Sequence, residues 1–235
     1  MRLYTGTSGY SYKEWKGSFY PEDLAAKSFL EFYASRLGAV EINNTFYRLP
    51  KTSVLENWAA QVPEDFRFSI KASRRITHFT RMKPEAQEPL EYLLSTLGSL
   101  GDRLGVILFQ LPPNLKVDLE RLEGFLAMLP EGTPAAFEFR HDSWKDDAVA
   151  DLIRSRGMVL VCADTEDSGD DEEIIETGAW GYLRLRRPDY STAALERWAD
   201  RLRDTSWEHA FVFFKHEDEG AGPRMAEQFK TMFDG

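Results

Sequence analysis

Apolar and polar residues alternate in several short segments of this chain, as they do in β-strands with two different faces. In the segment 135–140, Phe137 and Phe139 alternate with Glu138 and Arg140. The segments 39–43, 66–71 and 182–186 repeat the pattern, with apolar residues on one face and polar or charged residues on the other. Several charged strand faces in one chain indicate a polar site that is collected at the ends of many strands.

Eight segments have the pattern of strands, and helical patterns lie between them. The expected strands are near Arg2–Gly6, Ala39–Ile42, Phe66–Lys71, Leu104–Gln110, Ala135–Arg140, Val159–Ala163, Gly181–Leu185 and Ala210–Phe214. The expected helices are Asp23–Leu37, a short helix after Thr52, Glu85–Leu100, Leu119–Leu129, Asp146–Arg156, Ser191–Arg203 and Ala221–Phe233. After the sixth strand, the acidic segment 167–173 predicts a solvated turn followed by at most a short helix.

Strands that alternate with helices favour parallel βαβ units. Eight such units in 235 residues predict a single α/β domain over residues 1–235, a closed (β/α)8 TIM-like barrel. An open doubly wound sheet is the alternative, but no GxGxxG or phosphate-loop glycine pattern follows the first strand. In a barrel of this kind the functional site lies at the carboxyl ends of the strands.

Composition and charge narrow the classes of partner. The chain is 43% hydrophobic and 29% charged with a net charge of -10, which is typical of a soluble globular protein and unlike one that coats nucleic acid. No apolar run approaches the roughly 18 residues that a membrane span needs, and no signal peptide pattern opens the chain. With Cys162 as its single cysteine, the chain is expected to be cytoplasmic, without a membrane partner and with little affinity for nucleic acid.

Three carboxylates near the expected strand ends, Glu41, Glu138 and Asp164, are the candidate catalytic residues. Two such groups beside a bound sugar can act as general acid and base. The alternative is structural, because a charge inside a barrel must be paired. Lys71, Arg140 or Arg184 could neutralise the carboxylates in such a network. The two interpretations are compatible, since active sites are themselves paired networks.

The strand ends also carry basic, amide and aromatic residues that could bind a substrate. Arginine presents a fork that fits phosphate or carboxylate, so a small anionic or sugar-like substrate is the expected partner. Lys71, Arg140 and Arg184 would hold its charge, with Arg186 and Lys215 as a basic rim. Asn43, His78, Gln110 and His141 would orient the ligand, and Tyr10, Tyr47 and Trp144 would line the pocket.

Two further functions remain open. His78, His141 and His216 follow expected strand ends, and Glu217 adds a carboxylate beside the last of them. A divalent metal is therefore possible but not favoured, because no HxH or HExxH spacing is present. Metal-dependent apurinic endonucleases use similar barrels, which suggests a phosphodiesterase only by analogy of fold. A metabolite-binding or adaptor barrel without catalysis is the other alternative to a hydrolase- or lyase-like enzyme.

Several longer motifs resemble one known family. They are the segments 5–10, 15–21, 40–47, 68–78, 109–113 and 137–144, and the matches extend from residue 5 to about residue 225. Together they resemble the domain-of-unknown-function 72 family, also called YecE-like. The resemblance implies a TIM-like barrel and little about activity. Members of that family commonly carry an Asn–Asn pair after the last strand, where this chain has Lys215, His216 and Glu217, so any role of that pair does not transfer.

Overall fold

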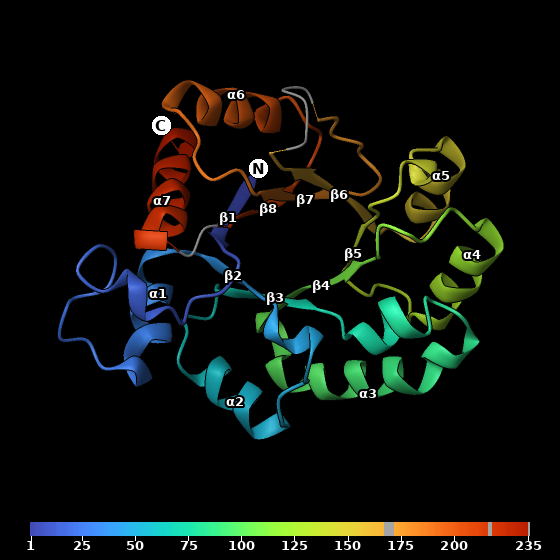
Figure 1. Cartoon of the computed structure of the whole chain (residues 1–235), viewed down its shortest axis with the longest axis horizontal. Coiled ribbons are helices and arrows are strands. Elements are labelled where there is room, and N and C mark those ends of the chain that lie inside the picture. The colour runs from blue at the N-terminus through green and yellow to red at the C-terminus, as the bar shows by residue number, and fades with distance from the viewer. Residues whose placement is uncertain (167–171, 216–217, 235) are drawn as a thin grey trace.

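The computed structural model describes residues 1–166, 172–215 and 218–234. These residues form an eight-stranded, all-parallel sheet in the order β1-β8-β7-β6-β5-β4-β3-β2. The helices surround the strands (Figure 1), and β1 and β2 meet at a bridge between Ser8 and Glu41. The predicted TIM-like barrel is therefore confirmed.

The strands are β1 Arg2–Thr7, β2 Ala39–Ile42, β3 Arg67–Lys71, β4 Leu104–Gln110, β5 Ala135–Glu138, β6 Val159–Asp164, β7 Trp180–Leu185 and β8 His209–Phe214. The α-helices are α1 Phe29–Arg36, α2 Thr52–Ala60, α3 Gln87–Leu97, α4 Leu119–Met128, α5 Asp147–Ser155, α6 Thr192–Arg203 and α7 Ala221–Asp234. Short 3-10 segments are Lys13–Trp15, Ala26–Ser28, Asn44–Phe46, Pro84–Ala86, Gly98–Arg103, Asp142–Trp144 and Asp218–Gly220, and Arg75–Phe79 is a π-helix.

Two expected helices are shorter than their patterns predict. The helix expected from Asp23 begins as α-helix only at Phe29, because Ala25 is extended and a 3-10 turn follows it. The helix expected over Glu85–Leu100 is α-helical at Gln87–Leu97 and tightens to 3-10 turns at both ends. Residues 172–179 contain no helix, and the rest of the acidic segment, 167–171, lies outside the described residues.

Successive side chains point alternately into the barrel and out to the helices. Outward residues such as Phe68, Phe109 and Phe137 belong to a large core that the strands share with the helices. A smaller inward cluster contains Tyr4, Ala39, Val106, Leu108, Ala136, Val159, Tyr182, Phe211 and Phe213. Along β4 the inward positions change from apolar Val106 and Leu108 to polar Gln110, so polarity increases toward the carboxyl end.

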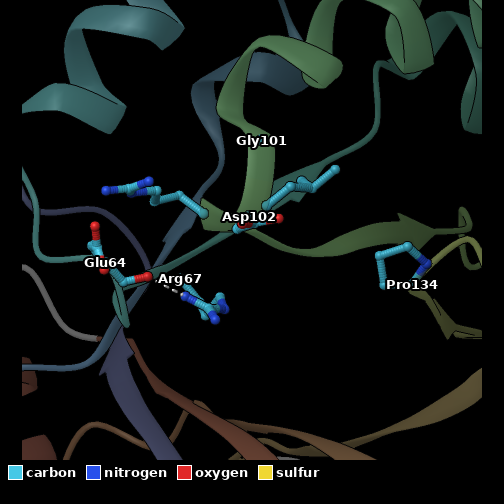
Figure 2. A pocket seen from close by; sticks show the side chains of 7 residues that line it. Glu64, Arg67, Gly101, Asp102 and Pro134 are labelled. Carbon is cyan, nitrogen blue, oxygen red and sulfur yellow. Dashed lines mark hydrogen bonds between the residues drawn. The ribbon is translucent and has the colours of Figure 1, made fainter.

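Aromatic rings close the amino end of the barrel, where Tyr4 stacks on Phe211 at 4.8 Å between ring centres. A cavity of about 630 Å³ at this end is lined by Glu64, Arg67, Gly101, Asp102, Arg103, Leu104 and Pro134 (Figure 2). Its lining contains two acids and two arginines, and Arg67 donates to the Glu64 carbonyl at 2.9 Å. Since no single charge sign dominates there, this end is a weaker candidate for a ligand site than the opposite end.

Tyr33 of α1 seals the seam between β1 and β2. Its hydroxyl donates to the Ala39 carbonyl at 2.9 Å and accepts from the Thr7 amide at 2.8 Å. Gly6 faces this contact, and a Cβ atom there would lie 1.8 Å from the Ala39 carbonyl oxygen and 2.9 Å from the Tyr33 hydroxyl. Only glycine therefore fits the seam at residue 6.

Replacing Gly6 by alanine is expected to lower the free energy of unfolding by about 1–3 kcal/mol, as overpacking of a tight core does. Gly124 is exposed within α4, and a Cβ atom added there would have no neighbouring atom within 4 Å. At that position the same substitution should stabilise by roughly 0.5–1 kcal/mol through helix propensity. Urea unfolding of both variants measures the difference, and equal effects would contradict the close approach at the seam.

Candidate functional site

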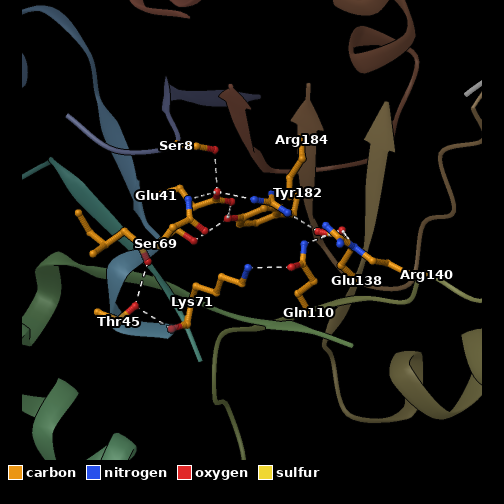
Figure 3. A network of polar contacts seen from close by, with 12 residues as sticks. Ser8, Glu41, Thr45, Ser69, Lys71, Gln110, Glu138, Arg140, Tyr182 and Arg184 are labelled. Carbon is orange, nitrogen blue, oxygen red and sulfur yellow. Dashed lines mark hydrogen bonds and ion pairs between the residues drawn. The ribbon is translucent and has the colours of Figure 1, made fainter. Parts of the chain in front are cut away.

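The carboxyl ends of the strands bring polar side chains together inside the barrel, as Figure 3 shows. The members of this mouth network are Ser8, Glu41, Asn43, Ser69, Lys71, Gln110, Glu138, Arg140, Tyr182 and Arg184. Most lie at or just beyond the ends of their strands, and Ser69 and Tyr182 lie at the inward positions one step below Lys71 and Arg184. The alternation seen in the sequence therefore assembles one polar layer above the apolar interior.

Arg184 joins two carboxylates at the centre of the mouth network. Its terminal nitrogens donate to Glu41 Oε1 at 2.8 Å and to Glu138 Oε2 at 2.5 Å. All three side chains are buried, with at most 3% of each residue exposed. Burial acts to lower the pKa of Arg184, but both carboxylates outweigh it and raise the pKa, so the guanidinium stays charged. Such a buried triad costs desolvation, and losing one member leaves a buried charge unpaired.

Glu41 is held ionised by four donors from four different positions. Its Oε1 accepts from Ser8 at 2.8 Å and Asn43 at 2.9 Å in addition to Arg184, and its Oε2 accepts from Tyr182 at 2.7 Å. Burial acts to raise the pKa of Glu41, but the charge and hydrogen bonds of Arg184 outweigh it, so the pKa lies below its usual range. Ser69 supports the arrangement through a 2.6 Å hydrogen bond with the Tyr182 hydroxyl.

Glu138 connects the acidic part of the network to Lys71. Its Oε1 accepts from Gln110 at 2.7 Å and from Arg140 at 3.0 Å. Burial acts to raise the pKa of Glu138, but the charges of Arg184 and Arg140 lower it to about 2. The Lys71 ammonium donates to the other end of the Gln110 amide at 2.7 Å. Burial, with the charge of Arg184, lowers the pKa of Lys71 to about 8.

Positive charge exceeds negative charge at this end of the barrel. Among the described residues of the mouth network and of β7 just beyond it, the cations are Lys71, Arg140, Arg184 and Arg186, and the anions are Glu41 and Glu138. Burial and the charge of Arg184 lower the pKa of Arg186, which indicates how closely the cations are gathered. In a protein with a net charge of -10, this end is a local basic site.

Asp164 lies apart from the other two candidate carboxylates. It has the outward parity of Cys162 on β6, and its oxygens accept from Arg187 at 2.8 Å and Tyr190 at 2.7 Å. It lines a separate cavity of about 280 Å³ against α6. The expectation that it joins Glu41 and Glu138 is therefore not met, because alternation along β6 turns it toward the helices. Arg187, rather than Lys71, Arg140 or Arg184, is the cation that contacts it.

Two aromatic candidates pack into the outer core. Trp144 is 3% exposed, stacks on Phe139 at 4.2 Å and donates its indole N–H to the Leu115 carbonyl at 2.7 Å. Tyr10 packs against the outer core and lies 6.2 Å from the Tyr33 ring, and burial raises its pKa. Packing therefore explains Trp144, and Tyr10 is a half-buried ring that packs against the same outer core.

The third aromatic candidate, Tyr47, is 69% exposed at the rim beside β3. The Arg74 guanidinium lies 5.4 Å from the centre of its ring and 5.2 Å from that of Phe79. Phe46 packs edge-on against both Tyr47 and His78 and also contacts the Lys71 ammonium, 4.4 Å from its ring centre. This aromatic rim therefore extends outward from the mouth network.

The two histidine candidates hold loops. The Nδ1 atom of His141 accepts from the Ser143 amide at 3.1 Å and starts the 3-10 turn there. The Nδ1 atom of His78 is 2.9 Å from the Thr77 hydroxyl. Burial, with the charges of Lys71 and Arg140, lowers the pKa of His78, so the charges of the mouth network act on this imidazole. His141 instead caps the 3-10 turn in the loop after β5. His216 and Glu217 lie outside the described residues.

Three members of the mouth network were not expected to belong to the site, namely Ser8, Ser69 and Tyr182. Ser69 and Tyr182 have the inward parity of Lys71 and Arg184 on their own strands, so alternation could have identified them. Ser8 continues the inward parity of Tyr4 one residue past the end of β1. Within the described ranges, no group of three or more His, Cys, Asp or Glu side chains could hold a metal ion. The part of the chain that the structure describes also has no helix long and apolar enough to cross a membrane.

Comparison with known proteins agrees with this architecture. Residues 4–235 match the family described as "Protein of unknown function DUF72". The chain is 31% identical over 130 residues to the UPF0759 protein YecE of Escherichia coli K12, which covers 55% of this chain and 47% of that protein. It is 28% identical over 150 residues to the UPF0759 protein YunF of Bacillus subtilis, with 60% and 52% covered. The chain thus spans about half the length of the curated relatives it matches.

Solved structures share the whole fold. A DUF72 family protein from Thermotoga maritima has a TM-score of 0.83 and 27% identity, with 100% of both chains covered. A DUF72 family protein from Enterococcus faecalis has a TM-score of 0.83 at 18% identity, with 99% and 96% covered, which supports the fold alone. On the family match over nearly its whole length, the chain belongs to the DUF72 family.

Proposed function

We propose that the protein is an enzyme, hydrolase- or lyase-like, that binds a small anionic substrate at the barrel mouth. One observation carries the proposal: three cationic side chains, Lys71, Arg140 and Arg184, gather with two carboxylates at the carboxyl ends of the strands. The two carboxylates are already engaged by Arg184. The remaining positive charge attracts a phosphate or carboxylate, which arginine binds with its planar fork.

The geometry favours an anionic substrate over a neutral sugar. Cleavage of a glycosidic bond needs one carboxyl group with a raised pKa to act as general acid. Glu41 and Glu138 both have lowered pKa values, so each is ionised at neutral pH. We therefore assign them the role of positioning the cations. Lys71, with a pKa of about 8, is the better placed of these groups to exchange a proton near neutral pH.

A ligand screen tests the binding half of this proposal. Phosphate, malonate, sugar phosphates and oxo acids are added singly, and unfolding is followed by thermal shift. A ligand present at about 100 times its Kd raises the free energy of unfolding of the protein by roughly 2.7 kcal/mol. Arg140→Ala should abolish that shift, whereas Arg36→Ala should retain it. Arg36 is 49% exposed and pairs with Glu227 at the end of α1. Equal losses in both variants would contradict binding at the mouth.

Turnover distinguishes an enzyme from a binding barrel. Each stabilising ligand is incubated with protein and followed by mass spectrometry for several hours. Conversion supports the enzyme, and tight binding with no conversion supports a metabolite-binding barrel instead. Metal analysis of protein purified without added metal covers the remaining alternative, because stoichiometric zinc or manganese would favour a metal-dependent phosphodiesterase.

A further inference from the structure

We propose that the Lys71 amine is a nucleophile that forms an imine with the carbonyl carbon of a small anionic oxo compound. The inference rests on the proposed function, because the neighbouring cations hold the anionic group of the same molecule. It adds a reacting atom and a substrate class to that site. The substrate must carry both a carboxylate or phosphate and an aldehyde or ketone.

The contacts of Lys71 differ from those of a lysine that serves a structural ion pair. Its ammonium donates to the Gln110 Oε1 atom at 2.7 Å and lies over the Phe46 ring at 4.4 Å. Gln110 in turn donates to Glu138, so a neutral amide stands between the ammonium and the nearest carboxylate along this chain of hydrogen bonds. Glu138 itself is satisfied by Arg140 and Arg184. The amine is thus held in place by a neutral amide and an aromatic ring.

The location of Lys71 suits attack on a bound ligand. It is the last residue of β3, on the inward face and half-buried, where barrel enzymes place reacting groups. The charged groups around it come from three other strands: Arg184 opposes its positive charge, as Arg140 does, whereas Glu41 and Glu138 favour it. The charge of Lys71 also acts on His78, in the π-helix after β3, and helps to lower its pKa. An anion drawn in by the arginines is therefore brought to the amine.

The protonation state supports the same role. Burial, followed by the charge of Arg184, lowers the pKa of Lys71 to about 8. On that basis roughly a tenth of the side chain is the neutral amine at pH 7, compared with a few molecules in ten thousand for an ordinary lysine. A lysine that is desolvated beside another cation is one of the ways in which proteins activate an amine nucleophile.

The reaction is a condensation with no change of oxidation state. The lone pair of the neutral nitrogen attacks the carbonyl carbon, and one proton moves from the nitrogen to the oxygen to give a carbinolamine. The carbon–oxygen bond of that intermediate then breaks as the oxygen takes a second proton and leaves as water. That second proton comes from the nitrogen when an imine forms, and from solvent when the nitrogen keeps its proton as an iminium. Sodium borohydride, added from outside, supplies a hydride that reduces the carbon–nitrogen double bond to a stable secondary amine.

Reductive trapping tests the proposal on the whole chain. The protein is incubated with pyruvate or dihydroxyacetone phosphate, treated with sodium borohydride, digested and mapped by mass spectrometry. The expected result is an adduct on Lys71 in at least tenfold excess over Lys51, Lys145 and Lys215. Acetone and dihydroxyacetone, which lack the anionic group, should label Lys71 with a much smaller excess over the other lysines. No adduct on Lys71 from either anionic probe, or equal labelling of Lys215, would overturn the proposal.

Two measurements separate this inference from the proposed function. If phosphate and pyruvate stabilise the protein but Lys71 carries no adduct, the anion site stands and the nucleophile is wrong. If no anion stabilises it and no adduct forms, both fail. Lys71→Met should abolish trapping but keep the fold, because a lowered folded-state pKa means the native environment disfavours the ammonium. Competitive acetylation of wild-type protein, which needs no ligand, should show Lys71 reacting far faster than Lys145 at neutral pH.

Discussion

Replacing Arg184 by methionine is expected to lower the free energy of unfolding by about 3–5 kcal/mol near pH 7, since it leaves two buried carboxylates without their cation. Methionine has a similar length and no charge, so cavity effects are small beside the electrostatic loss. Glu41 and Glu138 are 0% and 3% exposed, and water cannot readily replace the lost donors. Urea unfolding measures the loss directly.

The loss should depend on pH in a defined direction. In the wild type, the pKa of Glu138 is about 2, below its value in the unfolded chain. The contribution of its ion pairs to the stability of the folded state is therefore complete above about pH 4.5 and is lost as the pH falls toward 2. In the variant, both carboxyl groups are buried without Arg184 and their pKa values rise. Mild acid therefore protonates them and removes the cost of burying two unpaired charges. The difference between wild type and variant should thus shrink between neutral pH and about pH 4.

An exposed arginine provides the control. Arg224 is 69% exposed and lies 3.7 Å from Asp189, which is 74% exposed. Arg224→Met should change stability by less than about 1 kcal/mol, as expected for a surface ion pair. An Arg184 variant as stable as the Arg224 variant would show that the buried triad does not hold the carboxylates as described.

Replacing Glu138 by glutamine is expected to lower kcat/KM by about 100-fold on the substrate that the ligand screen identifies, because misplacement of reacting groups by about 1 Å costs this much. Glu138 orients Arg140 and Arg184 directly, and Lys71 through Gln110. A glutamine nitrogen must face one of these donors. The cations and the amine therefore lose their alignment together.

Asp164→Asn is the matched comparison, since Asp164 is also a buried carboxylate held by an arginine and a polar neighbour. It faces α6 rather than the mouth network. We expect it to lose stability to a similar extent as Glu138→Gln but to keep kcat/KM within about threefold, as for a site that makes no contact with the reacting groups. A parallel loss of activity in both variants would mean that stability alone explains the effect of Glu138.

Alternation of apolar and polar residues along the strands predicts the order of the strands and most of the residues that face into the barrel. The order of strands and helices follows from short apolar runs separated by longer periodic segments, and Glu41, Glu138 and Arg184 occupy the inward positions that their neighbours imply. The same rule, applied to Asp164, turns it outward with Cys162. Asp164 lies apart from Glu41 and Glu138 because a position at a strand end does not decide the face, whereas parity along the strand does.

Other features depend on contacts between distant parts of the chain. Arg184 meets Glu41 across 143 residues, and no local pattern reveals which of several cations takes that place. Trp144 follows a strand end like a pocket residue, yet Phe139 and the Leu115 carbonyl hold it in the outer core. Whether such a residue packs in the core or lines a pocket depends on tertiary contacts, which the spacing of residues in the sequence does not reveal.

The seam between β1 and β2 links the mouth network to motion. The two strands meet at the bridge from Ser8 to Glu41 and at a backbone hydrogen bond from Gly38 to Thr5, and the side chains of Ser8 and Glu41 hydrogen-bond at 2.8 Å. Arg184 then ties Glu41 to β7 on the far wall. Local opening of this seam therefore removes one of the four donors that hold Glu41. Amide hydrogen exchange at the seam should slow when an anion binds, so that the barrel is most tightly closed when its site is occupied.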